Sequence, residues 1–280
     1  MKNILLPTDF SSNSLNAIHY AVNFLKDENC MFYLLNTFRV PYIENDELMM
    51  YNLQKLSVIE ESLFKSSQRD LKSTVEKIKF GANHDFKLLS DYNFFIDAVK
   101  QNIKELKIDL IIMGTKGATG AKGIFMGSNT GDVIMKTDCN VLAVPDKAKY
   151  KTPKEIVFPT DFKLAFKEDE LSILKKIAIQ NNSNIRILYV QNEDSFDKEQ
   201  EANKKNLTKY FDALNYSFHT LTNTDFEYAI NCFTQSRGDI DMIAIIAKHY
   251  NIFQRLFFKP KVEELSFHTK IPLLVLHKNK

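Results

Sequence analysis

The sequence has few of the residues that mark several large classes of protein. It contains three cysteines, no tryptophan and eight glycines among 280 residues. Because the cysteines are widely spaced and form no C-x-x-C pair, we expect reduced thiols rather than a disulfide framework. The histidines form no ligand-spaced pair such as H-E-x-x-H, so we expect no metal site built from protein ligands alone. No apolar run approaches the ~20 residues that a transmembrane helix needs, so no membrane span is expected.

Acidic and basic residues are almost balanced, which removes a general attraction to polyanions. Lysine and arginine together number 37, aspartate and glutamate number 35, and the net charge is +2. We therefore expect neither nucleic acid nor an anionic membrane as a partner. The stretch "MKNILLPTDF" reaches Pro7 and Asp9 before an apolar signal region can form, which predicts no signal peptide. Together with the reduced thiols, this predicts a cytoplasmic protein.

The chain contains an internal duplication. "NILLPTDF" at residues 3–10 returns as "EIVFPTDF" at 155–162, and "IDLIIMGTKG" at 108–117 corresponds to "IDMIAIIAKH" at 240–249. The offset falls from 152 residues at the first match to 132 at the second, so the second copy is shorter in its middle. A shared order over such a length predicts two copies of one domain. The basic stretch "PDKAKYKTPK" separates them, which assigns residues 1–147 and 152–280 to the two domains.

Hydrophobic periodicity predicts strands that alternate with helices. Continuous apolar runs indicate strands buried on both faces, and apolar residues at helical spacing indicate the helices that cover them. In the first domain we expect strands at 4–6, 31–38, 85–91, 108–113 and 140–144, and helices at 11–29, 46–79, 93–107 and up to 137. The stretch 46–79 is either one long helix or two joined ones. The second domain repeats this order. The pattern predicts an α/β protein of two Rossmann-like domains, each an open five-stranded parallel sheet flanked by helices.

Six of the eight glycines lie in one segment, "IIMGTKGATGAKGIFMGSNTGDVI", residues 111–134. The segment follows a predicted strand, at the carboxyl edge where open parallel sheets bind ligands. Glycine lets backbone N–H groups approach a ligand, and the first N–H groups of a helix favour an anion. Ser128 or Asn129 is expected to cap the helix that follows. The segment is therefore a candidate phosphate cradle, with a flexible surface loop as the alternative.

This segment resembles the nucleotide motif of the universal stress proteins. The family pattern G-2x-G-9x-G-[S/T] is matched without a gap by Gly114, Gly117, Gly127 and Ser128. The opening "ILLPTDFSSNS" and the closing "CNVLAVP" also look like the first and last strands of that family. The resemblance implies adenine-nucleotide alpha-hydrolase-like domains that bind ATP in one branch of the family, and it extends to tandem chains.

The resemblance also implies a set of ATP-binding residues. Asp9 would lie beside the adenosine, and the backbone at Thr37 would read the adenine edge. The next residues would flank the ribose and hold the phosphates, and a divalent ion such as Mg²⁺ or Mn²⁺ would be bound through phosphate oxygens. The full set is Pro7, Asp9, Thr37, Met113, Gly114, Lys116, Gly117, Gly127, Ser128, Asn129 and Thr130. In the alternative interpretation Asp9 only caps the turn into the first helix, because Asp161 stands at the same place in the second copy.

The second copy has lost the glycine motif. At the offset of 132, the motif residues are replaced by Ile246, His249, Lys259 and Pro260. Their side chains would block backbone contacts to phosphate, and proline removes an N–H donor. ATP is therefore expected in the first domain only. The segment 248–261 that carries three of these residues is basic and aromatic. It is either a surface for an acidic partner or, in the more ordinary interpretation, a core-facing stripe with a solvated basic face.

The sequence thus predicts a cytoplasmic stress-response protein that binds ATP in its first domain and acts as a nucleotide-dependent regulator or scaffold. Its regulatory protein partner is unknown. A nucleotide-independent interaction module and a slow ATPase are the alternatives. No general base stands beside the cradle, so no catalytic residue is assigned. The resemblance implies that the last strands, 140–144 and 272–276, pair within the chain, and a further homodimer stays open.

Overall fold

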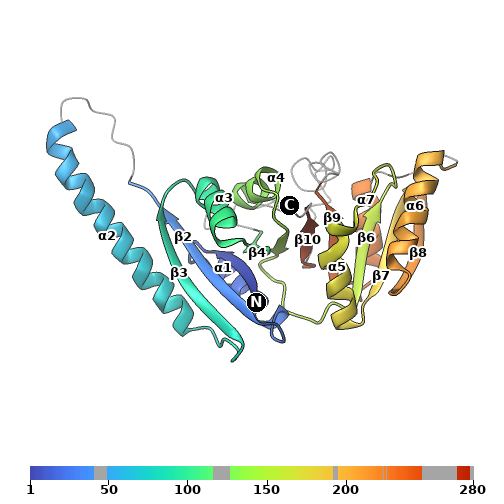
Figure 1. Ribbon diagram of the computed structural model, residues 1–280, viewed down its shortest axis with the longest axis horizontal. Coiled ribbons are helices and arrows are strands. Elements are labelled where there is room, and N and C mark those ends of the chain that lie inside the picture. Colours follow the sequence, from blue (N-terminus) through green and yellow to red (C-terminus); the bar gives the residue numbers. More distant parts are fainter. Residues whose placement is uncertain are drawn as a thin grey trace.

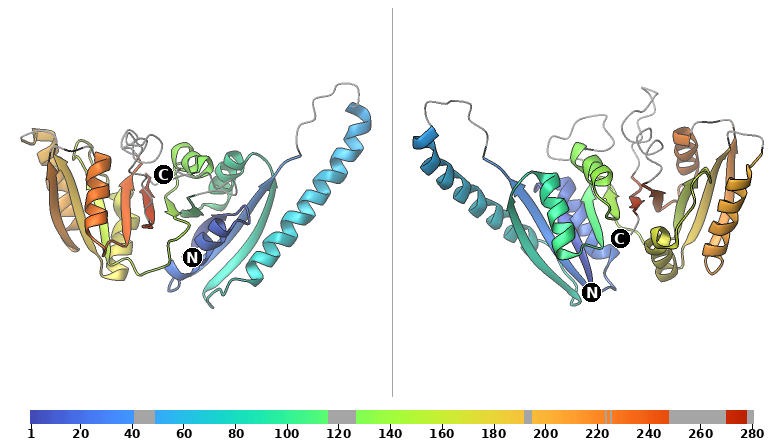
Figure 2. Two further views of the ribbon diagram at one scale, coloured as in Figure 1. Left: turned by 180° about the vertical axis from the view of Figure 1, so that it is seen from behind. Right: turned by 45° about the horizontal axis from the view of Figure 1, so that its top comes forward.

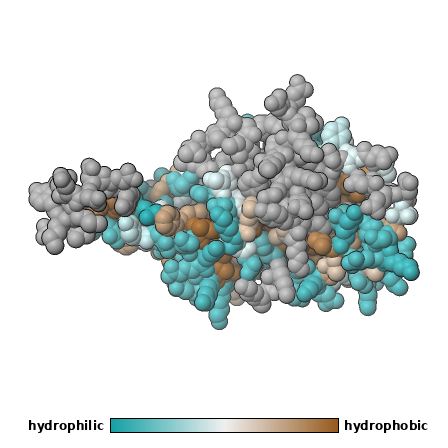
Figure 3. Space-filling view, turned by 90° about the horizontal axis from the view of Figure 1, so that it is seen from above, coloured by the Kyte–Doolittle hydropathy of each residue, from teal (hydrophilic) through white to brown (hydrophobic). Residues whose placement is uncertain are grey.

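The computed structural model describes residues 1–40, 49–115, 127–191, 195–222, 224, 226–247 and 270–277. Within these ranges, none of the helices combines the length and the apolar character that crossing a membrane requires. Hydrophilic residues make up most of the described surface seen in Figure 3, and hydrophobic residues appear there at a few separated places.

Strands and helices alternate along the first half of the chain. Its elements are β1 (Lys2–Pro7), α1 (Ser12–Phe24), β2 (Cys30–Phe38), α2 (Met49–Glu76), β3 (His84–Tyr92), α3 (Phe95–Leu106), β4 (Leu110–Gly114), α4 (Ser128–Lys136) and β5 (Val141–Val144). The strands agree with the periodicity of the sequence, and the long periodic stretch forms one helix rather than two.

The second half repeats this order of strands and helices. A counterpart of α4, between β9 and β10, would fall outside the described residues. Its elements are β6 (Glu155–Thr160), α5 (Glu168–Asn181), β7 (Asn184–Gln191), α6 (Lys198–Phe211), β8 (Asn215–Thr222), α7 (Phe226–Ser236), β9 (Met242–Ile246) and β10 (Leu273–Leu276). Helix α6 has 14 residues, whereas its counterpart α2 has 28. This difference accounts for most of the shortening of the second copy that the two sequence offsets predict.

The ten strands of the described residues belong to one sheet, in the order β3-β2-β1-β4-β5-β10-β9-β6-β7-β8 (Figure 1). Strands are parallel within each half, and β5 pairs with β10 antiparallel, with Leu142 opposite Leu274. The α/β fold class is confirmed, and the two five-stranded parallel sheets are joined edge to edge. The joining strands are the two last strands of the sequence repeat, for which pairing is predicted.

Helices cover both faces of the sheet (Figure 2), and its central strands, such as β4, β5, β9 and β10, are apolar and buried. On one face Ile4 and Leu6 pack in a core that includes residues of α1, α2, α5 and α6. On the other face Leu5 packs in a core that includes residues of α3, α4 and α7. Adjacent residues of β1 therefore enter opposite cores, as expected for a strand buried on both sides.

Candidate functional site

The turn after β1 is built by the Pro-Thr-Asp-Phe sequence. Thr8 Oγ1 accepts a hydrogen bond from Phe10 N at 3.0 Å. Asp9 Oδ1 accepts from Ser11 N at 3.1 Å and from Ser11 Oγ at 2.6 Å. These side chains replace the backbone partners that the turn lacks, and they hold Phe10 at a φ of 63°. The turn delivers the chain into α1, whose N-cap is Ser11.

The second Pro-Thr-Asp-Phe builds the same turn after β6. Thr160 Oγ1 accepts from Phe162 N at 3.0 Å, and Asp161 Oδ1 accepts from Lys163 N at 2.9 Å. Phe162 has a φ of 57°, close to that of Phe10. The repeated motif is therefore explained by turn geometry in both halves. Asp9 does make the turn-capping contact of the alternative interpretation, and its exposed carboxylate also lines the cavity described below.

The connection from β4 to α4 is closed by two hydrogen bonds. Gly127 N donates to Thr115 O at 2.5 Å, and Thr130 Oγ1 donates to Gly114 O at 2.7 Å. The first turn of α4 is thereby held against the carboxyl end of β4. The expectation that Ser128 or Asn129 caps this helix is wrong. Gly127 is the N-cap, and no side chain caps the helix.

Glycine is required at position 114 because the side chain of Asn13 packs directly against it. A Cβ atom at this position would lie 2.7 Å from Asn13 Nδ2 and 2.8 Å from Asn13 Cγ. Asn13 belongs to the first turn of α1 and is only 6% exposed. The first glycine of the motif thus lets α1 approach the end of β4.

A cavity of about 410 Å³ opens at the carboxyl ends of β1, β2 and β4 and at the start of α4. It brings together nine of the residues that the sequence predicts: Pro7, Asp9, Thr37, Met113, Gly114, Gly127, Ser128, Asn129 and Thr130. The remaining two, Lys116 and Gly117, lie outside the described residues. Asp9 is the only charged side chain among the described residues that line the cavity.

Four residues of the cavity wall were not expected from the sequence. They are Thr8, Ser14, Asn36 and Phe95. Thr8 and Asn36 directly neighbour Asp9 and Thr37, so the strand-end rule that selected those two residues could have found them. Ser14 and Phe95 are reached only by folding, because they belong to the first turns of α1 and α3.

A hydrogen-bond network holds Asn36 in place on one wall of the cavity. Its Nδ2 donates to Thr8 O at 2.8 Å, and its Oδ1 accepts from Ser67 Oγ at 2.8 Å. Ser67 Oγ is in turn 2.6 Å from Ser90 Oγ on β3. The side-chain amide is therefore fixed by groups from β1, α2 and β3, which gives that wall a defined shape.

The corresponding position in the second half is filled by aromatic side chains. Tyr189 is the counterpart of Asn36. In the β6–β7 register Tyr189 lies opposite Thr160, and in the β1–β2 register Asn36 comes directly after the pair Pro7–Leu35. The ring of Tyr189 lies 4.8 Å from that of Phe196 and 5.3 Å from that of Phe162, measured between centroids. Ile246 ends β9 where Gly114 ends β4. The other expected replacements, His249, Lys259 and Pro260, lie outside the described residues.

The first half of the chain is similar to known proteins. Residues 1–145 match the universal stress protein family. A universal stress protein of Methanocaldococcus jannaschii, MJ0531, is 30% identical over 151 residues, which cover 53% of this chain and 84% of the relative.

Two solved structures are among those that this chain matches. The crystal structure of a universal stress protein from Archaeoglobus fulgidus has a TM-score of 0.63 at 15% identity, and the match covers 99% of this chain and 98% of that one. A universal stress protein solved in complex with cAMP has a TM-score of 0.33 at 17% identity, covering 51% of this chain and 96% of that one. Because the family matches residues 1–145, more than half of its length, this chain belongs to the universal stress protein family.

Proposed function

We propose that the first domain, residues 1–147, binds ATP in the cavity at the ends of β1, β2 and β4, and that occupancy regulates a partner protein. The observation that carries this proposal is the convergence of nine of the eleven predicted ATP-binding residues on one cavity of about 410 Å³. A volume in this range suits a small-molecule ligand. The second domain, 152–280, would be structural or regulatory.

The start of α4 supports the placement of the phosphates. The helix has no acidic residue in its first turn and no side-chain cap, so among the described residues no side chain neutralises its N-terminal N–H groups. Ser128 and Asn129 are exposed there and add side-chain donors. Because Asp9 is the single carboxylate on the described wall, a divalent ion would depend mainly on phosphate oxygens.

Asp9 supports the placement of the ribose. Its Oδ1 accepts two hydrogen bonds from Ser11, which fixes the carboxylate at the rim of the cavity. A carboxylate held in this way is preorganised to accept hydrogen bonds from ribose hydroxyls. The described residues of the wall include no positioned general base for water attack. We therefore propose binding rather than rapid hydrolysis, with turnover well below the ~1 s⁻¹ lower limit typical of kinases.

Calorimetry of ATP binding to the full chain tests the proposal through a matched pair of glycines. Gly127 has a φ of −62° and a ψ of 154°, which valine accepts, so Gly127→Val places methyl groups at the cavity without backbone strain. We expect a loss of about 2 kcal/mol or more of ATP affinity. The control is Gly238→Val in the second half, where an added Cβ meets no atom within 4 Å. Unchanged affinity in Gly127→Val would place the nucleotide elsewhere.

The two turn aspartates separate binding from folding. Asp9→Ala and Asp161→Ala each remove a side-chain hydrogen bond to the same type of turn, so we expect similar losses of stability. Only Asp9→Ala should weaken ATP binding, because only Asp9 lines the cavity. Equal ATP affinity in both variants would mean that Asp9 stabilises the turn and does not contact the nucleotide.

A further inference from the structure

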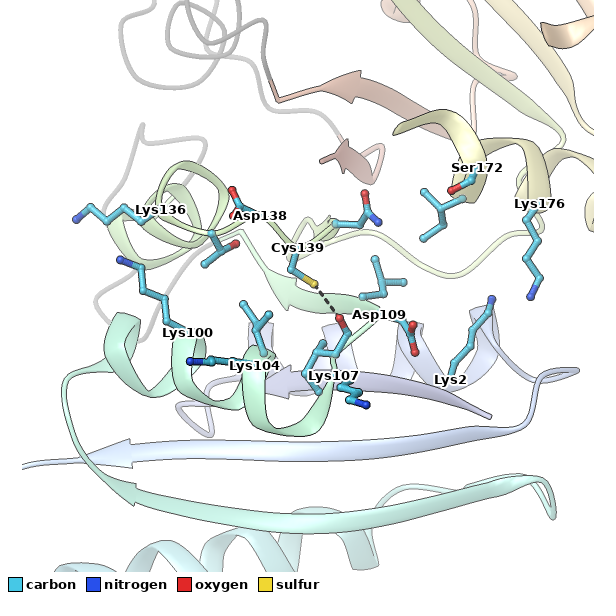
Figure 4. Close-up of a pocket in the computed structure, with 16 residues that line it drawn as sticks. Lys2, Lys100, Lys104, Lys107, Asp109, Lys136, Asp138, Cys139, Ser172 and Lys176 are labelled. Carbon is cyan, nitrogen blue, oxygen red and sulfur yellow. Dashed lines mark hydrogen bonds between the residues drawn. The ribbon is translucent and has the colours of Figure 1, made fainter. Parts of the chain in front are cut away.

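A second, larger cleft lies at the amino ends of the strands, where the two halves meet. Its volume is about 1050 Å³. The first half contributes the start of β1, the C-terminal part of α3, the end of α4 and the residues that follow each of these helices, while α5 contributes the opposite wall from the second half. Figure 4 shows this cleft with the side chains that line it. It is separate from the nucleotide cavity and shares none of its lining residues.

Lysines dominate the charge of this cleft. Six lysines line it against two aspartates: Lys2, Lys100, Lys104, Lys107, Lys136 and Lys176 face Asp109 and Asp138. The carboxylate of Asp109 is already engaged, because its Oδ2 accepts a hydrogen bond from Asn3 N at 2.7 Å. A positive cleft is unexpected in a chain whose net charge is only +2.

The lysines fall into two groups by their partners. Lys2 and Lys176 share Glu28, at 3.0 and 3.5 Å, and Lys136 pairs with Asp132. The three lysines of α3 and its C-cap, at positions 100, 104 and 107, have no ion pair within the described part of the chain. Positive charge is therefore left uncompensated along one side of the cleft.

Helix stabilisation explains only part of this arrangement. Lys104 and Lys136 stand in the last turns of α3 and α4, where a cation interacts favourably with the helix dipole. Lys100 stands in the middle of α3, and Lys2 and Lys176 belong to a strand and to a helix of the other half. These three gain nothing from the ends of α3 or α4, yet they border the same cleft.

The floor of the cleft excludes thiol chemistry. Cys139 Sγ lies 3.5 Å from Ile108 O, to which it donates, and the residue is 6% exposed. Burial raises the pKa of this thiol to about 12, so it stays protonated and unreactive near neutral pH. The cleft is thus equipped for binding rather than for reaction.

We infer that this cleft binds a linear chain of phosphate groups. Lysines lie at both ends of the cleft, with Lys100, Lys104 and Lys136 toward one end and Lys2 and Lys176 toward the other (Figure 4). One compact anion cannot reach both ends, whereas a phosphate chain carries a charge on every unit. No aromatic side chain is among the described residues that line the cleft, so no base would be stacked. This chemistry is shared by inorganic polyphosphate and by the phosphate chain of a nucleoside polyphosphate.

Because the walls come from both halves, the ligand would also link them. Contacts from Lys176 on α5 and from α3 would be made together only while β5 and β10 keep the halves side by side. Binding would therefore stabilise the joined sheet by mass action.

Calorimetry on the full chain with inorganic tripolyphosphate, at about 150 mM salt to screen weak surface contacts, tests this inference. The variant Lys100→Gln/Lys104→Gln/Lys107→Gln should lose at least about tenfold in affinity, because hydrogen bonds to charged groups are removed. The matched control Lys72→Gln/Lys77→Gln/Lys79→Gln removes the same charge from exposed lysines outside the cleft and should change affinity by less than about twofold. Equal losses in both triple variants, or no binding by the wild type, would overturn the inference.

Three further arms complete the test. Lys176→Gln should weaken binding from the opposite wall, which excludes an effect confined to the folding of α3. The same titration in the Gly127→Val background, in which the nucleotide cavity is blocked, should still show tripolyphosphate binding that the Lys100 triple variant weakens; loss of all binding in that background would assign the anion to the nucleotide cavity and overturn the inference. Adenosine tetraphosphate, titrated in the same Gly127→Val background, distinguishes the sources: equal affinity assigns inorganic polyphosphate, and higher affinity, lost in the Lys100 triple variant, assigns a nucleoside polyphosphate.

Discussion

Replacing Gly114 by alanine tests the close approach of α1 to β4. The added Cβ would lie 2.7, 2.8 and 2.9 Å from the three terminal atoms of the Asn13 side chain. Real Cβ atoms do not approach heavy atoms this closely, so the buried amide must move. Alanine would cause no backbone strain here, because Gly114 does not have a positive φ. Overpacking of this kind costs about 1–3 kcal/mol of unfolding free energy.

A double-mutant cycle isolates the contact. Asn13→Ala removes the atoms that the new methyl group meets, so Gly114→Ala should cost about 1 kcal/mol less in that background than in the wild type. Urea unfolding followed by circular dichroism supplies the four free energies. Gly238→Ala, where the added Cβ meets nothing within 4 Å, is the control and should not destabilise the protein. Additive costs, or a harmless Gly114→Ala, would refute the steric argument.

Four further outcomes are expected. Burial lowers the pKa of His277 to about 4 from its usual value near 6.5, against an opposing effect of Asp138. The neutral imidazole therefore costs no stability above pH 6.5, and stability is lost as the pH falls from 6.5 toward 4. In urea titrations the wild type should lose about 3 kcal/mol more unfolding free energy than His277→Leu between pH 7 and pH 4, and parallel curves would contradict this. Cysteines at Leu142 and Leu274, in a background without native thiols, should crosslink within one chain, because these residues are direct partners in the β5–β10 register; crosslinks between chains alone would exclude the paired arrangement. In the native protein Cys232 should be the one thiol that reacts with Ellman's reagent, since the other two are buried with raised pKa values, and rapid reaction of all three would contradict that burial. Steady-state ATP turnover should stay well below ~1 s⁻¹, and a faster rate would reveal a catalytic group outside the described residues.

The sequence predicts the fold well because its central strands are buried on both faces. Runs such as "LIIM" at residues 110–113 contain no polar residue, which identifies them as buried strands. The strand ends are also predictable, because Pro-Thr-Asp-Phe encodes a complete turn in which two side chains cap the backbone. The repeat therefore fixes two equivalent points of the fold without reference to function.

The candidate site was harder to complete, because part of its wall comes from segments distant along the chain. Phe95 reaches the cavity from the start of α3, and Ser67 acts on it only through Asn36. No local pattern records such contacts. The predicted cap of α4 is wrong because the helix already begins at Ser128, which leaves Gly127 as the N-cap. The lysine cleft has no local pattern in the sequence either, because its charges come from β1, α3, α4 and α5.

Hydrogen exchange with and without ATP tests the central claim most directly, because it locates the ligand along the full chain. We predict that saturating ATP slows exchange in peptides that contain the end of β4 and the start of α4, residues 113–115 and 127–130, and the turn at 7–9. Peptides that contain the corresponding end of β9, residues 244–247, should exchange at an unchanged rate. Protection at β9 with none at α4, or no protection in either half, would contradict the account.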